Sequence, residues 1–204
     1  MEQLLIKIVK NDLWHSRWLN ALSFMENTGA RKISACEHPY QVTYLQLKHA
    51  AEEHRHAYYL KKQIKKLTVA FPENYKAENL LAPLFTQQYL QRLDIYCAKY
   101  LKRTLQLKGE DLRFAAYLLV TYAIEVRADE LYPIYQRVLD TTGSKVMVKS
   151  IIAEEQGHLE EMIVQLKQFA TDWEKHAAVI LTYEQELSQT WWRAIAQEIE
   201  GIQE

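Results

Sequence analysis

Two segments of the chain carry the same four-residue pattern, a glutamate followed three positions later by a histidine. They are Glu53 to His56 and Glu155 to His158, and another glutamate precedes each at a comparable distance, Glu26 before the first and Glu125 before the second. On a helix, positions three apart lie on one face, so each glutamate and its histidine can point to the same place. Four carboxylates and two imidazoles are a donor set typical of paired divalent metal ions.

The six residues stand in otherwise apolar rows, with neighbours three or four positions away. These neighbours are Leu22 and Ala30 around Glu26, Leu60 after His56, Tyr122 before Glu125, and Ile151 and Met162 around the second pair. Burying four carboxylates without positive charge costs several kcal/mol for each of them. The apolar rows contain no matching set of Lys or Arg. Two divalent ions would supply the missing charge, and oxygen ligands with imidazole favour iron or manganese over zinc.

The elements that must position these residues are predicted to be long helices. The 204 residues include only five glycines and four prolines, and no segment alternates between apolar and polar residues as a strand would. We expect one all-α domain spanning 1–204. It is predicted to be a four-helix bundle with core helices at about 2–35, 44–67, 111–141 and 145–169, an inserted helix at about 84–107 and a C-terminal helix at about 172–200.

Local signals place the ends of these helices. Pro39 ends the first helix, because the residue before a proline is pushed out of the helical region. Thr43 is a suitable N-cap for the second, Gly143 separates the third from the fourth, and Thr171 or Asp172 can cap the last. Pro133 is expected to kink the third core helix.

With Glu26, Glu53-x-x-His56, Glu125 and Glu155-x-x-His158, the chain resembles the ferritin-like di-metal carboxylate superfamily over about residues 15–170. The resemblance implies a bundle with a long crossover between its second and third helices. It further implies that Glu53 or Glu155 bridges two metal ions, while Glu26 and Glu125 are more terminal ligands.

In layout the chain is closest to the small single-chain di-iron oxygenases. Glu154-Glu155-x-x-His158 and the spacing from Glu125 to Tyr132 are similar to aldehyde-deformylating oxygenases, and the run from Ile124 to Glu130 is similar to tRNA-modifying hydroxylases.

This resemblance implies a non-haem di-iron oxidoreductase that activates O2 at a carboxylate-bridged site. The expected cofactor is two Fe ions, with Mn or a mixed Mn/Fe pair as the alternative. The expected partners are O2, an apolar small-molecule substrate, an electron-donor protein and a second copy in a homodimer. The competing functions are iron oxidation and storage, a dimanganese catalase-type reaction, and tRNA hydroxylation. A vestigial site in a helical interaction protein is the remaining reading.

Residues near the six form a second group of candidates. Tyr59, Tyr122 and Tyr132 share the same helix faces and are either core aromatics or hydrogen-bond partners of the ligands. Asp129 is a candidate to hold a ligand imidazole, and His49 is predicted to pack or to support the ligands. His15, His38, His54 and His176 are expected at the surface or in loops, and Cys36 and Cys97 as reduced thiols.

The overall charge gives little indication of large partners. The formal net charge is −1, which does not provide the basic field expected of a nucleic-acid-binding protein. The longest apolar run, Phe114 to Ile124, is shorter than the roughly 20 residues of a membrane span. We therefore expect a cytoplasmic protein without membrane association.

Overall fold

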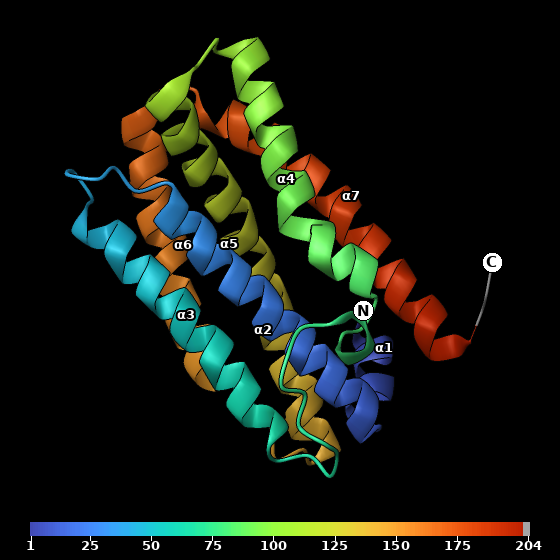
Figure 1. Ribbon diagram of the computed structural model, residues 1–204. Helices are drawn as coiled ribbons and strands as arrows, with labels where there is room; N and C mark the ends of the chain where they lie inside the picture. The colour runs from blue at the N-terminus through green and yellow to red at the C-terminus, as the bar shows by residue number, and fades with distance from the viewer. Residues whose placement is uncertain (202–204) are drawn as a thin grey trace.

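The computed structural model describes residues 1–201, apart from the side chain of Gln156, and within that range the chain is all-α (Figure 1). It contains seven α-helices and one 3-10 helix, with no strand among the described residues. The α-helices are α1 (Glu2–Val9), α2 (Asp12–Ala35), α3 (Tyr44–Ile64), α4 (Pro83–Thr104), α5 (Gly109–Thr142), α6 (Lys149–Phe169) and α7 (Trp173–Glu200). None of these helices combines the length and hydropathy needed to cross a membrane.

Four of the helices lie side by side as two antiparallel pairs. Helix α2 packs along α3, and α5 packs along α6. Figure 1 shows that α3 and α5 run in the same direction, so the chain must return along the molecule between them. The segment 65–82 and helix α4 make this return.

The crossover is fixed to α2 by hydrogen bonds from buried polar side chains. The amide of Asn20 donates to the backbone carbonyls of Asn74 and Asn79, at 3.0 and 2.9 Å. The hydroxyl of Ser23 lies 2.9 Å from that of Tyr75. These contacts satisfy backbone groups that a loop lying on a helix would otherwise bury without partners.

Helices α4 and α7 pack against each other and against α5, and a partly buried ionic group joins all three. The guanidinium of Arg127 on α5 donates from two nitrogens to Glu184 on α7, at 2.9 and 2.8 Å. The hydroxyl of Tyr89 on α4 donates to the same carboxylate. A two-point guanidinium–carboxylate pair constrains orientation as well as distance, so this group fixes how the two added helices sit on α5.

The expectation of one helix over 2–35 is wrong at residues 10 and 11, where the chain breaks into α1 and α2. Asn11 is the N-cap of α2, and its side chain accepts hydrogen bonds from the backbone of Leu13 and Trp14. Asparagine is among the strongest N-cap residues because its oxygen replaces missing intrahelical acceptors. The apolar periodicity on both sides of this residue concealed the break.

The other predicted ends are close to those observed. Thr43 caps α3 through the backbone N–H of Gln46, and Gly143 ends α5 with a positive φ of 69°. Asp172 occupies the N-cap position of α7 without a capping hydrogen bond from its side chain. Helix α5 continues through Pro133.

Helix α6 starts at Lys149 rather than at about 145, because glutamine side chains of other helices accept hydrogen bonds from the backbone N–H groups just before it. Gln63 accepts from the N–H of Met147 at 3.1 Å, and Gln136 accepts from that of Val148 at 2.7 Å. These tertiary hydrogen bonds hold the segment in a non-helical path that helix propensity alone does not indicate.

Two of the histidines expected at the surface are instead buried. His15 is 0% exposed and His176 is 2% exposed, and their ring nitrogens lie 2.6 Å from the hydroxyl of Tyr135 and 2.7 Å from that of Tyr100. The expectation was wrong because tyrosines that are distant in sequence supply hydrogen bonds that make burial tolerable. His54 is exposed and His38 is half-buried. Cys36 and Cys97 are free thiols.

The buried His15 predicts an acid-sensitive contribution to stability. Burial lowers its pKa from 6.5 to about 4, although Asp12 opposes the shift. Between these values the unfolded chain binds a proton that the folded chain does not, so stability falls as pH decreases from 6.5 towards 4. At about 1.4 kcal/mol per pKa unit, the loss is about 3 kcal/mol.

Denaturant unfolding of the wild type and of His15→Gln between about pH 7 and about pH 4.5 measures this contribution. The wild type is expected to lose more stability than the variant as pH falls. Parallel pH profiles for the two proteins would contradict this assignment.

Candidate metal centre

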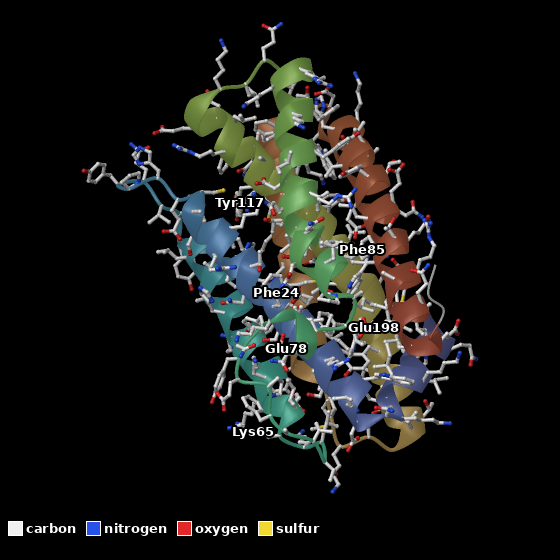
Figure 2. The ribbon with its side chains drawn as sticks, turned by 45° about the vertical axis from the view of Figure 1, so that its right-hand side comes forward. Phe24, Lys65, Glu78, Phe85, Tyr117 and Glu198 are labelled. Atoms are coloured by element: carbon white, nitrogen blue, oxygen red, sulfur yellow. The ribbon has the colours of Figure 1, made fainter. Side chains whose placement is uncertain are left out.

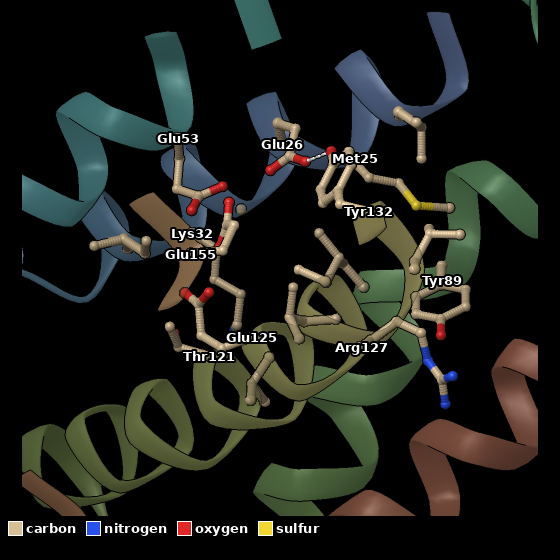
Figure 3. Close-up of a pocket in the computed structure, with 18 of the residues that line it drawn as sticks. Met25, Glu26, Lys32, Glu53, Tyr89, Thr121, Glu125, Arg127, Tyr132 and Glu155 are labelled. Atoms are coloured by element: carbon tan, nitrogen blue, oxygen red, sulfur yellow. Dashed lines mark hydrogen bonds between the residues drawn. The ribbon is translucent and has the colours of Figure 1, made fainter. Parts of the chain in front are cut away.

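The structure brings together all six residues selected from the sequence. Glu26 comes from α2, Glu53 and His56 from α3, Glu125 from α5, and Glu155 and His158 from α6. Glu26 is half-buried, and the other five are between 1% and 7% exposed. Figure 3 shows the carboxylates of Glu53, Glu125 and Glu155 facing one another, with that of Glu26 beside them.

Within this cluster the donor atoms form two groups of four. One group contains Glu26, Glu53, His56 and Glu155, and the other contains Glu53, Glu125, Glu155 and His158. The ligand atoms in each group lie within 4.8 Å of one another. Because Glu53 and Glu155 belong to both groups, the arrangement has two neighbouring positions for an ion with two shared carboxylates between them.

The inward-facing nitrogen of each histidine is suited to a metal ion. Nδ1 of His56 lies 3.0 Å from an oxygen of Glu155, and Nδ1 of His158 lies 3.5 to 3.9 Å from oxygens of Glu155, Glu125 and Glu53. Both Nδ1 atoms are buried and have no partner in hydrogen-bonding geometry. A buried polar atom without a partner requires an explanation, and coordination of an ion by both atoms provides one.

Carboxylates hold the outward-facing nitrogens of the two histidines. Each of the helices α3 and α6 supplies a glutamate to the histidine of the other, and we call this arrangement the reciprocal exchange. Nε2 of His158 lies 2.7 Å from Glu52 on α3, and Nε2 of His56 lies 2.7 Å from Glu154 on α6. An ionised carboxylate only accepts hydrogen bonds, so each Nε2 carries a proton, and in the neutral imidazole the Nδ1 lone pair is then directed at the cluster. Arg55 also donates to Glu154, at 2.6 Å.

Sequence analysis missed the roles of Glu52 and Glu154. One feature of the sequence could have indicated them: a second glutamate directly precedes each motif, so that each one reads Glu-Glu-x-x-His. Asp129 was a candidate for this supporting role, and that prediction is wrong, because Glu154 and Glu52 hold the two Nε2 atoms and Asp129 is exposed. The true partner of each imidazole comes from the opposite helix pair, and spacing within one helix cannot indicate it.

The three tyrosines predicted near the cluster have different surroundings. The hydroxyl of Tyr132 donates to Glu26, as the dashed line in Figure 3 shows. Tyr122 instead packs edge-on against Trp173 of α7, with ring centroids 5.6 Å apart. Tyr59 packs against the apolar core, and its predicted role near the ligands stays a prediction. His49 is fully buried and pairs with Glu161 at 2.8 Å, with its ring 4.7 Å from that of His158.

Without an ion, protons balance the charge of the cluster. Burial and neighbouring carboxylates raise the pKa of Glu53 and of Glu125 well above the usual value. Burial opposes a charge on Glu155 too, but its contacts with His158 and His56 outweigh this and lower its pKa. Burial also disfavours a charge on His158, yet Glu125 and Glu155 raise its pKa to about 11. Metal ions would therefore displace protons from these groups.

A cavity of about 80 Å³ adjoins the carboxylates. Glu26, Glu53, Glu125 and Glu155 line one part of it, and the remaining wall is mainly apolar. The added helices contribute Tyr89 and Leu90 of α4 and Trp191 of α7 to this wall. The two cationic side chains in the wall are both paired, Lys32 with Asp94 and Arg127 with Glu184. The space beside the candidate metal positions is thus suited to an uncharged, apolar molecule.

Proton release is the first expected consequence of this site. Addition of Fe2+ to the metal-free protein under anaerobic conditions at neutral pH is expected to release protons, because Glu53, Glu125 and His158 must lose them to become ligands. A pH-indicator dye in weakly buffered solution measures the release. Glu125→Gln, which lacks one of these protons, is expected to release fewer. Metal binding without any proton release would contradict the assigned protonation states.

The reciprocal exchange predicts a second effect. Glu52→Gln and Glu154→Gln are each expected to weaken metal binding by about 10- to 100-fold, because the imidazoles lose the negative charge of the carboxylates that orient them and raise their basicity. Glu160→Gln, at an exposed position of α6, is the matched control. Titration with Fe2+ or Mn2+ gives the dissociation constants, and equal values for the control and the two variants would refute the role of the exchange.

Comparison with protein-family models, with curated proteins and with solved structures found no match to this chain.

Proposed function

We propose that this protein is a ferritin-like non-haem di-iron oxidoreductase that activates O2 and acts on an apolar small molecule. The observation that carries the proposal is the pair of four-ligand groups sharing Glu53 and Glu155, next to an apolar cavity. Such a donor set, with two terminal carboxylates and two imidazoles, is the ligand pattern of di-iron and di-manganese carboxylate bundles.

The helix arrangement supports the ferritin-like part of the proposal. The ligands come from α2, α3, α5 and α6, which lie as two antiparallel pairs, and the long return through α4 allows α3 and α5 to run in the same direction. One long crossover is the connection expected for ferritin-like bundles.

The donor atoms favour iron or manganese as the resident metal. Four carboxylates and two imidazoles combine hard oxygen donors with nitrogen donors, and the unpartnered Nδ1 atoms of His56 and His158 face the carboxylates. Two iron ions at these positions would supply the electrons that reduce O2. An electron-donor protein is then required to restore the reduced state between turnovers.

The surrounding residues have roles that follow from their contacts. Glu52 and Glu154 keep the imidazoles in one orientation, and the Tyr132 hydroxyl donates to Glu26 and limits the movement of this ligand. The apolar wall excludes water from the space beside the carboxylates and holds an apolar substrate by burying its surface.

The cavity favours substrate chemistry over iron storage. Part of its wall is made by Tyr89 and Trp191 from the two added helices, which cover α5 in this chain. A mainly apolar space serves the binding of an organic substrate, whereas a path for hydrated iron ions requires polar walls.

Metal analysis tests the proposal directly. Protein produced with iron and manganese both available is expected to contain about two metal ions per chain, and Glu155→Ala is expected to lose both because it removes a shared ligand. Glu160→Ala, at an exposed position of the same helix, should retain them. The reduced, iron-loaded wild type should also consume O2 faster than the same concentration of free Fe2+.

Each of three results would overturn the proposal. Manganese together with release of O2 from peroxide would indicate a catalase-type function. Large assemblies that accumulate many iron ions per chain would indicate storage. No bound metal after anaerobic loading would remove the metalloenzyme assignment.

A further inference from the structure

A buried tyrosine and a buried histidine form a close pair away from the carboxylate cluster. Tyr135 on α5 and His15 on α2 are both 0% exposed, and the phenol oxygen lies 2.6 Å from Nε2 of the imidazole. Because burial lowers the pKa of His15 to about 4, the imidazole is neutral near pH 7. A neutral imidazole at hydrogen-bond distance can accept the phenol proton.

This pair adjoins a continuous group of tryptophans. The ring of Trp18 lies 5.9 Å from that of Tyr135 and 5.3 Å from those of Trp191 and Trp192. Trp191 and Trp192 are themselves 5.4 Å apart. Trp18 and Trp191 are buried, whereas Trp192 is half-buried. The aromatic group therefore extends from the interior to the surface at α7.

The other end of the aromatic group approaches the candidate metal centre. Tyr135 follows Tyr132 by one helical turn, and the hydroxyl of Tyr132 donates to Glu26. On α2, Trp18 and Glu26 are separated by two steps of four residues through Leu22, so they lie along one face. Trp191 and Tyr132 both line the cavity beside the carboxylates.

We propose that Tyr135, His15, Trp18, Trp191 and Trp192 form a relay that carries single electrons between the metal centre and the protein surface. When Tyr135 gives one electron to an oxidised metal ion at the candidate centre, which would be reduced by one electron, the phenol O–H bond breaks and its proton moves to Nε2 of His15. The products on the protein are a neutral tyrosyl radical and an imidazolium. An electron from a one-electron donor at the surface then passes through the tryptophans to Tyr135, and the proton returns to the phenol oxygen.

The histidine distinguishes this group from ordinary aromatic packing. Tyr117 on α5 is also buried, at 1% exposed, but among the described residues its hydroxyl is not paired with an imidazole. Oxidation of Tyr117 would therefore leave its proton without a histidine to accept it. Figure 2 shows Tyr117 towards the end of the molecule opposite Lys65, and its substitution provides a matched control on the same helix as Tyr135.

The test uses the metal-free protein, so it does not depend on the proposed function. Tris(bipyridine)ruthenium(III), generated by a light flash, serves as a soluble one-electron oxidant, and transient absorption and electron paramagnetic resonance detect the radicals. The wild type is expected to form a neutral tyrosyl radical, and its formation should be slower in D2O. Because Tyr40, Tyr44 and Tyr58 are exposed and would react with the oxidant directly, all proteins in this test carry phenylalanine at these three positions. In this background Tyr135→Phe should lose most of the signal, and Tyr117→Phe should retain it.

His15→Gln separates proton transfer from packing. This variant is expected to form the tyrosyl radical more slowly and to lose the solvent isotope effect, which a purely structural role would not alter. The free energy of unfolding of each variant is measured first, to establish that the variant is folded. An unchanged signal in Tyr135→Phe, or an isotope effect that persists in His15→Gln, would overturn the assignment of the pair.

The connection to the metal centre rests on the proposed function and has a separate readout. In oxidised, iron-loaded protein, reduction of the metal by a soluble one-electron donor is followed by absorbance. Trp192→Phe is expected to slow this reduction, and Trp173→Phe, whose ring contacts Tyr122 instead, should not. Equal rates in wild type and Trp192→Phe would overturn the surface end of the relay. Failure to bind iron would refute the proposed function and with it the connection to the metal, but not the photochemical result.

Discussion

The burial of four carboxylates between helices is the constraint on which the rest of the structure depends. In a medium of low dielectric constant, isolated carboxylates would destabilise the fold by several kcal/mol each. Among the described residues, the ion-pair partners of Glu53, Glu125 and Glu155 are two histidines, His56 and His158, and not lysine or arginine. Raised pKa values at Glu53 and Glu125, together with protonated His158, show how protons supply the missing charge when no ion does. The same donors become a ligand set once protons are exchanged for metal.

This constraint also explains the form of the contacts between α3 and α6. Each helix contributes a histidine to the cluster and a glutamate that holds the other helix's histidine, Glu52 for His158 and Glu154 for His56. The exchange fixes the relative position of the two helices through charged hydrogen bonds at the edge of the cluster. A change in one helix thus alters ligand orientation in the other.

The added helices connect the cluster to the rest of the molecule. The partly buried group of Arg127, Glu184 and Tyr89 fixes α4 and α7 on α5, and these helices complete the apolar wall of the cavity. Trp191 belongs to this wall and also to the aromatic group that surrounds Trp18. Binding of an apolar molecule and electron movement would therefore share one structural region.

The sequence by itself determined the all-α fold, most helix bounds and the six clustered residues, because helical periodicity shows which side chains share a face. It did not determine what lies opposite that face. The break at Asn11, the burial of His15 and the partners of the ligand histidines were decided by the tertiary structure. The break at Asn11 depends on local capping hydrogen bonds, which the apolar periodicity on both sides concealed. The other two features depend on hydrogen-bond partners that are distant in sequence and that only folding brings near. Asp129 shows the same limit, since its position on the helix suggested a role that Glu52 and Glu154 take from the opposite pair.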